Sequence, residues 1–179
     1  AQPDFGLLPG QSLHAIFQTS LGSVDCGLAI DTAPHTVATF VALAEGRREW
    51  IDPRTGEHTF RPLYTGTVFH RIIPDFLIQG GDPSGTGTGG PGFTVPDENV
   101  ATSVFDRAGV LGLATRGANT GGSQFFITAG PARHLDGRYT RLGMCGNTRV
   151  ISAIATAPRN ERNRPARDII LQSVQVVAR

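Results

Sequence analysis

The apolar runs of this chain are short, and glycine or proline separates most of them. The sequence holds 23 Gly and 12 Pro in 179 residues, and residues 80–92 contain seven glycines in thirteen positions. Short apolar runs are typical of strands, and glycine and proline favour the turns between them. Residues 13–18 and 23–30 alternate in part and meet around Leu21 and Gly22, which predicts an opening β-hairpin. The chain is therefore expected to fold mainly into β-structure.

Two further segments have the periodicity of amphipathic helices. Residues 34–45 repeat apolar side chains at i, i+3, i+4 and i+7, with Pro34 at an early helical position and a cap expected at residues 31–32. A second helix is predicted over residues 147–157, with Asn147 as its cap. The remaining predicted strands are 68–73, 76–79, 110–115, 125–129, 139–144 and 169–177. Many short strands with two helices favour a closed or nearly closed β-barrel covered by helices, because closure removes exposed strand edges.

The length and composition of the chain fit a single domain. With 39% apolar residues, a chain of 179 residues can bury a core of its own. We expect a single domain over residues 1–179, with an N-terminal extension at 1–12 and a long polar surface loop at 47–67. The only tryptophan, Trp50, lies in this loop and is expected to be partly exposed. No apolar run is long enough to span a bilayer, so no membrane association is expected.

The charged residues exclude several classes of chemistry. All 16 basic residues are Arg, and the formal net charge is +1. Without lysine the chain cannot form a Schiff base or a phosphate-binding lysine loop, and without a basic patch nucleic-acid binding is not expected. The five histidines lack paired metal-ligand spacing, so we expect no metal and no cofactor. His70 is better explained as a residue held by structural hydrogen bonds.

Three sequence blocks carry a family resemblance. Residues 69–82, FHRIIPDFLIQGGD, resemble the central signature of the cyclophilins, the peptidyl-prolyl cis/trans isomerases. Residues 122–127, GSQFFI, are similar to the second signature of that family, and residues 135–137, LDG, follow in the family's order. With the opening hairpin, the first helix and the closing strand, the resemblance extends over residues 13–177. It implies an all-β-dominated fold, an eight-stranded antiparallel closed β-barrel capped by two α-helices.

The resemblance also implies an activity and its catalytic residues. The expected reaction is rotation about X-Pro peptide bonds in unfolded or flexible protein segments, which assists folding. Arg71 would donate a hydrogen bond to the twisted amide, Gln79 would orient the guanidinium and contact the substrate carbonyl, and Phe76 would contact the proline ring. From residue type alone, Arg71 could equally form a buried ion pair, and Gln79 could be a hydrogen-bonded strand residue.

Substrate-binding residues are implied in the same way. Leu77, Phe126 and Leu135 match the proline pocket, although residue type alone would place each of them in the core. Ala114 and Thr115 match the segment whose backbone pairs with the peptide, and Gln124 would line the groove. Gly87, Thr88 and Gly89 resemble the rim of a second pocket for residues preceding the proline, which would give broad substrate choice.

The chain departs from the best-known family members at the pocket rim. His134 stands where they carry Trp, and Tyr139 stands where they carry His. Loss of an indole removes a large flat contact and its N–H donor, so weaker cyclosporin binding is expected. The expected partners are proline-containing peptides and unfolded protein chains, and a monomer is expected. The alternative function is a non-catalytic module that binds proline-containing segments.

The long 47–67 segment is similar to that of bacterial members of the family. Two cysteines, Cys26 and Cys145, can form at most one disulfide, and two buried free thiols are the simpler interpretation. Between bacterial periplasm and cytoplasm, we favour the periplasm because the sequence begins without an initiator Met.

Overall fold

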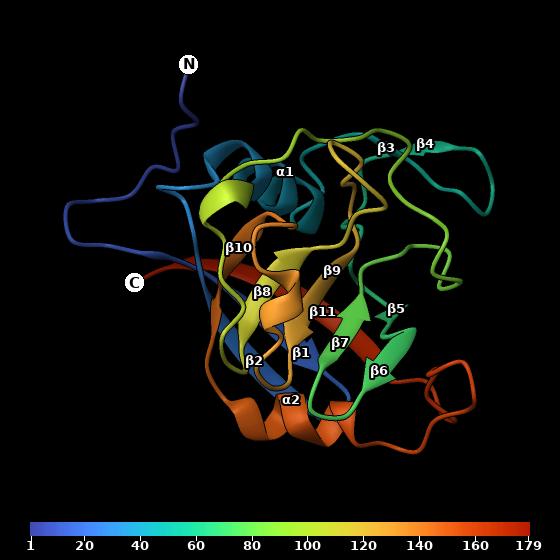
Figure 1. Ribbon diagram of the computed structural model, residues 1–179. Helices are drawn as coiled ribbons and strands as arrows, with labels where there is room; N and C mark the ends of the chain where they lie inside the picture. The colour runs from blue at the N-terminus through green and yellow to red at the C-terminus, as the bar shows by residue number, and fades with distance from the viewer.

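A nine-stranded antiparallel sheet forms the body of the protein, which is described over residues 1–179 by a computed structural model (Figure 1). The strand order is β5-β11-β1-β2-β10-β8-β9-β7-β6. The strands are β1 (Leu13–Thr19), β2 (Gly22–Leu28), β5 (Thr67–Val68), β6 (Arg71–Ile73), β7 (Leu77–Gly80), β8 (Val110–Leu113), β9 (Phe125–Thr128), β10 (Arg141–Cys145) and β11 (Ile170–Ala178). The predictions of an opening hairpin and a closing strand are confirmed, and these elements pair with one another. Buried and half-buried residues alternate strictly along β1, which explains why this strand could be predicted from the sequence.

The sheet is a strongly curled half-barrel, so the expectation of a closed eight-stranded barrel is wrong. Its two end strands, β5 and β6, are separated in the chain only by Phe69 and His70. At this corner the amide of Phe69 donates a hydrogen bond to the carbonyl of Ile169 (3.0 Å). The amide of Ile72 donates to the carbonyl of Asn163 (2.8 Å). These backbone groups therefore bond to the segment before β11, and the strand predicted over 68–73 is divided in two.

Two α-helices lie at opposite ends of the sheet, α1 (Pro34–Ala44) and α2 (Thr148–Ala155) (Figure 1). Pro34 occupies the first turn of α1 as expected, but no side chain of residues 31–32 caps the helix. Instead the carboxylate of Glu98, far away in sequence, accepts hydrogen bonds from the amide (2.5 Å) and hydroxyl (2.6 Å) of Thr36. Asn147 precedes α2 as expected, but its amide group donates to the carbonyl of Ser23 (2.9 Å). Two single-turn 3-10 helices, η1 (Val100–Thr102) and η2 (Arg133–Leu135), complete the helical structure.

A disulfide joins two adjacent strands of the sheet. Cys26 of β2 and Cys145 of β10 lie opposite each other and are bonded, so the interpretation as two free thiols is wrong. Their separation of 119 residues explains why spacing gave no indication of the pairing. None of the helices is both long enough and apolar enough to cross a membrane.

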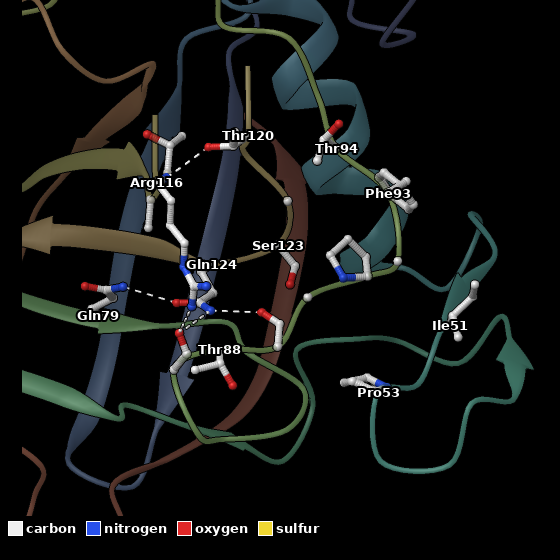
Figure 2. A pocket seen from close by; sticks show the side chains of 18 residues that line it. Ile51, Pro53, Gln79, Thr88, Phe93, Thr94, Arg116, Thr120, Ser123 and Gln124 are labelled. Carbon is white, nitrogen blue, oxygen red and sulfur yellow. Dashed lines mark hydrogen bonds between the residues drawn. The ribbon is translucent and has the colours of Figure 1, made fainter. Parts of the chain in front are cut away.

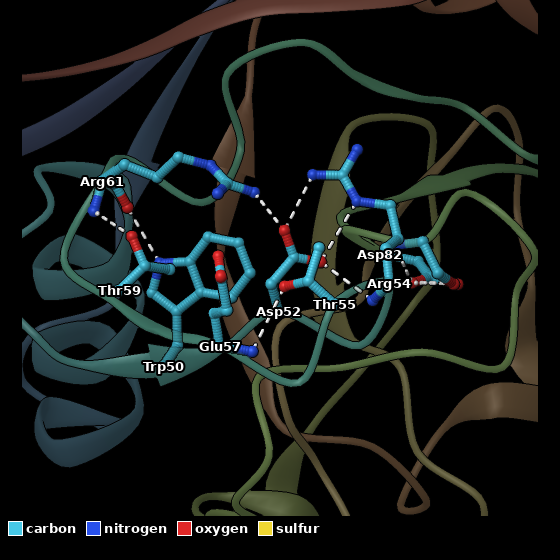
Figure 3. A network of polar contacts seen from close by, with 9 residues as sticks. Trp50, Asp52, Arg54, Thr55, Glu57, Thr59, Arg61 and Asp82 are labelled. Carbon is cyan, nitrogen blue, oxygen red and sulfur yellow. Dashed lines mark hydrogen bonds and ion pairs between the residues drawn. The ribbon is translucent and has the colours of Figure 1, made fainter.

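The segment 47–67 is more ordered than a polar surface loop. It forms a two-stranded antiparallel ribbon, β3 (Trp50–Ile51) and β4 (His58–Thr59). Trp50 is only 1% exposed, contrary to expectation, and its indole N–H donates to the carbonyl of Arg61 (2.8 Å). Buried Asp52 pairs with the guanidinium groups of Arg54 (2.9 Å) and Arg61 (2.7 Å) (Figure 3). The hydrogen bonds from Arg54, and those from Arg61, hold the pKa of Asp52 far below its usual range against the opposing effect of burial. These polar contacts join residues of the ribbon to one another, and buried Trp50 packs into the main core.

Candidate functional site

The hairpin of β6 and β7 brings Arg71 and Gln79 together. They are direct cross-strand neighbours, and Arg71 Nη1 donates to Gln79 Oε1 at 3.4 Å. The Gln79 amide in turn donates to Gln124 Oε1 (3.1 Å). The Arg71 side chain is exposed and takes part in none of the ion pairs of the protein. The alternative of a buried ion pair is therefore wrong, and the guanidinium keeps free donors facing solvent.

Beside this pair lies a small apolar cluster, separate from the main core. Its buried members are Leu77, Phe105, Val110, Phe126, Ala132 and Leu135, and half-buried Phe76, Ala114 and Tyr139 pack against them. The Phe126 ring lies 5.4 Å from that of Phe105 and 5.5 Å from that of Tyr139. The ring of Phe76 lies 5.0 Å from exposed His134. The apolar residues expected for the proline pocket are thus brought together, with Phe76 and Tyr139 at the accessible side.

Sequence reasoning missed two residues that shape this cluster. Phe105 is fully buried beneath Phe126, and its amide donates to Asp136 Oδ1 (2.6 Å). The residues around Phe105 show no apolar periodicity, so no local sequence pattern predicted that this side chain is buried. Gly112 lies opposite Phe126 in the β8–β9 register, and a Cβ there would come within 2.4 Å of the ring. A glycine inside a strand often marks a place where another group packs close to the backbone, so the sequence could have indicated this contact.

An open cavity of about 530 Å³ adjoins the Arg71 site (Figure 2). Gln79 and Gln124 lie on the boundary shared by the two regions, and Gln124 Nε2 donates to the carbonyls of Gly87 (3.1 Å) and Gly89 (2.9 Å). All the residues expected at the groove and the second pocket line this cavity, namely Gly87, Thr88, Gly89, Ala114, Thr115 and Gln124. Arg116, which sequence reasoning did not single out, also lines it.

Buried Asp82 organises the glycine-rich loop at the cavity rim. One carboxylate oxygen accepts from the amide (2.8 Å) and hydroxyl (2.7 Å) of Ser84, and the other accepts from the amides of Gly87 (2.7 Å) and Gly89 (3.0 Å). Burial alone would raise the pKa of Asp82, but these hydrogen bonds outweigh burial and lower it below its usual value. The carboxylate therefore stays charged at neutral pH and holds the loop in place.

His70 lies beneath this loop, and the expectation that hydrogen bonds hold it is wrong. The side chain is buried, its Nδ1 has no hydrogen-bond partner, and the ring packs under Gly87. Burial lowers the pKa of His70, although the charge of Asp82 opposes the shift. No group of three or more His, Cys, Asp or Glu side chains is placed to hold a metal ion.

Comparison with known proteins agrees with this geometry. The family described as cyclophilin type peptidyl-prolyl cis-trans isomerase/CLD matches residues 14–176. Peptidyl-prolyl cis-trans isomerase B of Streptomyces anulatus is 44% identical over 173 residues, covering 94% of this chain and 99% of that protein. Peptidyl-prolyl cis-trans isomerase A of Mycobacterium tuberculosis (strain ATCC 25618 / H37Rv) is 39% identical over 171 residues, covering 94% of each. The crystal structure of a Cryptosporidium parvum cyclophilin-type isomerase in the presence of the dipeptide Ala-Pro is 29% identical, with a TM-score of 0.77, covering 90% of this chain and 96% of that one.

Proposed function

This chain belongs to the cyclophilin-type peptidyl-prolyl cis-trans isomerases, and we propose that Arg71 is the group that stabilises the transition state of its reaction. Amide resonance raises a barrier of about 18–20 kcal/mol to rotation about a peptide bond. In the twisted state the prolyl nitrogen becomes pyramidal and regains a lone pair that can accept a hydrogen bond. No covalent bond is made or broken, so a catalyst only has to bind the twisted amide more tightly than the planar one.

The magnitude required fits the groups present. Uncatalysed isomerisation takes tens of seconds, and turnover on the order of 100 per second needs roughly 5 kcal/mol of differential stabilisation. A charge-assisted hydrogen bond contributes about 1.5–3 kcal/mol, and selection of the twisted shape by a fitted pocket supplies the remainder. Arg71 remains charged throughout the neutral range, so this contribution does not depend on pH there.

The pocket and the groove supply the recognition in this proposal. The proline ring lies against Phe76, Leu77 and Phe126, and Leu135 with Tyr139 completes the wall. The amide of Thr115 and the carbonyls of Ala114 and Thr115 form no hydrogen bond within the protein. These free backbone groups can form hydrogen bonds with an extended substrate, which would then lie beside residues 114–115 like an added strand. Such pairing recognises the main chain of the substrate rather than its side chains.

The observation that carries the proposal is the Arg71–Gln79 pair at the edge of the apolar cluster. A module that only binds proline-containing segments needs the cluster but does not need an exposed, uncompensated guanidinium beside it. We propose proline-containing peptides and unfolded chains as substrates, acted on by the monomer.

Exchange NMR on a short Ala-Pro peptide tests the proposal without a coupling protease. Wild type should catalyse exchange, and Arg71→Ala should lower kcat/KM by about 10- to 150-fold, the equivalent of one charge-assisted hydrogen bond. Arg71→Lys should recover little, because an ammonium group lacks the fork of donors. The matched control is Arg149→Ala, since Arg149 is exposed on α2 and forms no ion pair. Slow exchange by folded wild type despite saturable peptide binding, or full activity of Arg71→Ala, overturns the proposal.

We further propose that the protein works in an oxidising compartment, the bacterial periplasm or its equivalent. The disulfide of Cys26 with Cys145 supports this placement, because such bonds persist where thiols are oxidised and are rare in the cytosol. Alkylation of thiols in intact cells, followed by mass spectrometry, should find both cysteines blocked. Quantitative alkylation without prior reduction contradicts the placement.

A further inference from the structure

We propose that the cavity beside the isomerisation site selects substrates with an acidic side chain two or three residues before the proline, and that Arg116 is the residue that selects them. The inference rests on the proposed function, because it names the class of substrate for the same site. It also replaces the sequence-based expectation of broad substrate choice at this pocket.

The first support is the charge of the cavity. Arg116 is the only charged residue among those that line it (Figure 2). Its Nη2 donates to the carbonyl of Gly87 (3.1 Å), and the guanidinium forms none of the ion pairs of the protein. A carbonyl orients a guanidinium without neutralising it, so the remaining donors are free for a carboxylate.

The second support is that Arg116 is held in position on the cavity side. Its amide donates to the hydroxyl of Thr120 (2.9 Å), and that hydroxyl donates to the carbonyl of Gly117 (2.8 Å). These bonds fix the turn that follows Thr115. Figure 2 shows the Arg116 side chain running from this turn toward Gln124 and the glycine-rich loop. Both its base and its tip are thereby tied to the protein before any substrate arrives.

The third support is an opposite wall built from the segment 47–67. Ile51 and Pro53 line the cavity, and the Ile51 amide donates to the carbonyl of Pro91 (2.9 Å). A Cβ on Gly92 would lie 3.0 Å from the Ile51 side chain, so the ribbon is in close contact with the glycine-rich segment. Within the ribbon, Asp52 pairs with Arg54 and Arg61, which stiffens the segment that carries Ile51 and Pro53 (Figure 3). The wall bounds the cavity on the side away from Arg116 (Figure 2), and Arg116 itself is solvent-exposed, so it would attract a carboxylate as a surface charge does.

The position of the selected side chain relative to the proline follows from the boundary that the cavity shares with the Arg71 site. Gln79 and Gln124 belong both to the Arg71 network and to the cavity lining. A peptide paired with residues 114–115 is extended, at about 3.3 Å per residue, with side chains alternating between two faces. A side chain in this cavity therefore comes from a residue two or three places from the proline rather than from its immediate neighbour.

The test compares peptides that carry Ala, Glu, Gln or Arg at the second and, separately, the third position before the proline. Exchange NMR gives kcat/KM for each. For wild type, the ratio of kcat/KM for the Glu peptide to that for the Gln peptide should be about two- to fivefold at one of the two positions, and it should fall as salt is added. Arg116→Gln should bring the ratio close to one, and Arg116→Glu should make the Arg peptide the better substrate. The control Arg149→Gln should keep the wild-type ratio.

The outcomes separate this inference from the proposed function. Isomerisation of the Ala peptide reports on the Arg71 site alone, so its absence in wild type defeats the proposed function. If wild type isomerises the Ala peptide but treats Glu and Gln peptides alike, the selectivity of the cavity is refuted. A Glu preference that persists in Arg116→Gln shows that another group selects the substrate, and it refutes the role of Arg116.

Discussion

Gly112 leaves room for the ring at the base of the proposed proline pocket, and adding one methyl group there should damage the pocket. An ideal Cβ on Gly112 would lie 2.4 Å from Cζ, 2.7 Å from Cε1 and 2.9 Å from Cε2 of Phe126. The backbone of Gly112 is not in the left-handed region, so alanine fits its main-chain conformation. The effect of Gly112→Ala should therefore be purely steric.

The size of the effect follows from these distances. Carbon atoms in contact lie about 3.5–4.0 Å apart, so the Phe126 ring must move by more than about 1 Å. Phe105 and Tyr139 already pack against that ring, at 5.4 and 5.5 Å between centroids. Overpacking of this kind costs about 1–3 kcal/mol in the free energy of unfolding. A displacement of about 1 Å at a binding surface lowers kcat/KM by up to about 100-fold.

Urea unfolding and exchange NMR measure the two effects on Gly112→Ala. The matched control is Gly27→Ala, a strand glycine whose added Cβ would meet no atom closer than 3.7 Å. The control should stay within about 0.5 kcal/mol of wild type and keep its activity. If Gly112→Ala matches this control in both stability and kcat/KM, then Phe126 does not define the pocket as described.

Three further predictions concern stability and inhibition. Replacing Cys26 and Cys145 together by Ser should lower the free energy of unfolding by up to about 5 kcal/mol, because the disulfide closes a loop of 119 residues. Equal urea midpoints for wild type and the double variant contradict this prediction. Because the folded state lowers the pKa of His70, the unfolded state binds more protons, so stability should be full above pH about 6.5 and fall as the pH drops below it. A folded His70→Gln variant should lose less stability between pH 7.5 and 5.5, and equal losses refute this origin. With His134 on the pocket rim, cyclosporin should inhibit isomerisation only well above nanomolar concentration, and His134→Trp should tighten inhibition; nanomolar inhibition of wild type overturns the expectation.

Elements with a local period were predictable from sequence, and elements defined by distant contacts were not. The alternation along β1 and the apolar stripe of α1 follow from which residues must be buried. The cap of α1 could not be predicted, because Glu98 supplies it from 62 residues beyond Thr36. The division between β5 and β6 has the same origin, since the corner at Phe69 depends on backbone bonds to the segment before β11.

The same distinction applies to the site. Arg71 and Gln79 are eight residues apart on one hairpin, so a motif within one sequence block fixes their contact. The position of the ribbon residue Ile51 depends on the hydrogen bond that its amide donates to the carbonyl of Pro91, 40 residues further along the chain, and no local pattern encodes this contact. Arg116 lies next to the predicted groove, but its proposed role depends on the folded loop across the cavity, so its sequence position alone did not indicate that role.

The two proposed functional arginines have in common that their hydrogen-bond partners are neutral. Arg71 donates to the side-chain amide oxygen of Gln79, and Arg116 donates to the main-chain carbonyl of Gly87. Seven other arginines pair with carboxylates, as Arg54 does in the ribbon, while Arg48 and Arg159 also donate to neutral side chains but line neither the apolar cluster nor the cavity. A carboxylate would cancel most of the charge that a substrate meets, whereas a neutral oxygen orients the guanidinium and leaves its charge uncompensated. In the two proposals, the substrate-binding face therefore presents two positive groups, Arg71 for the lone pair of a twisted prolyl nitrogen and Arg116 for an acidic side chain upstream of the proline.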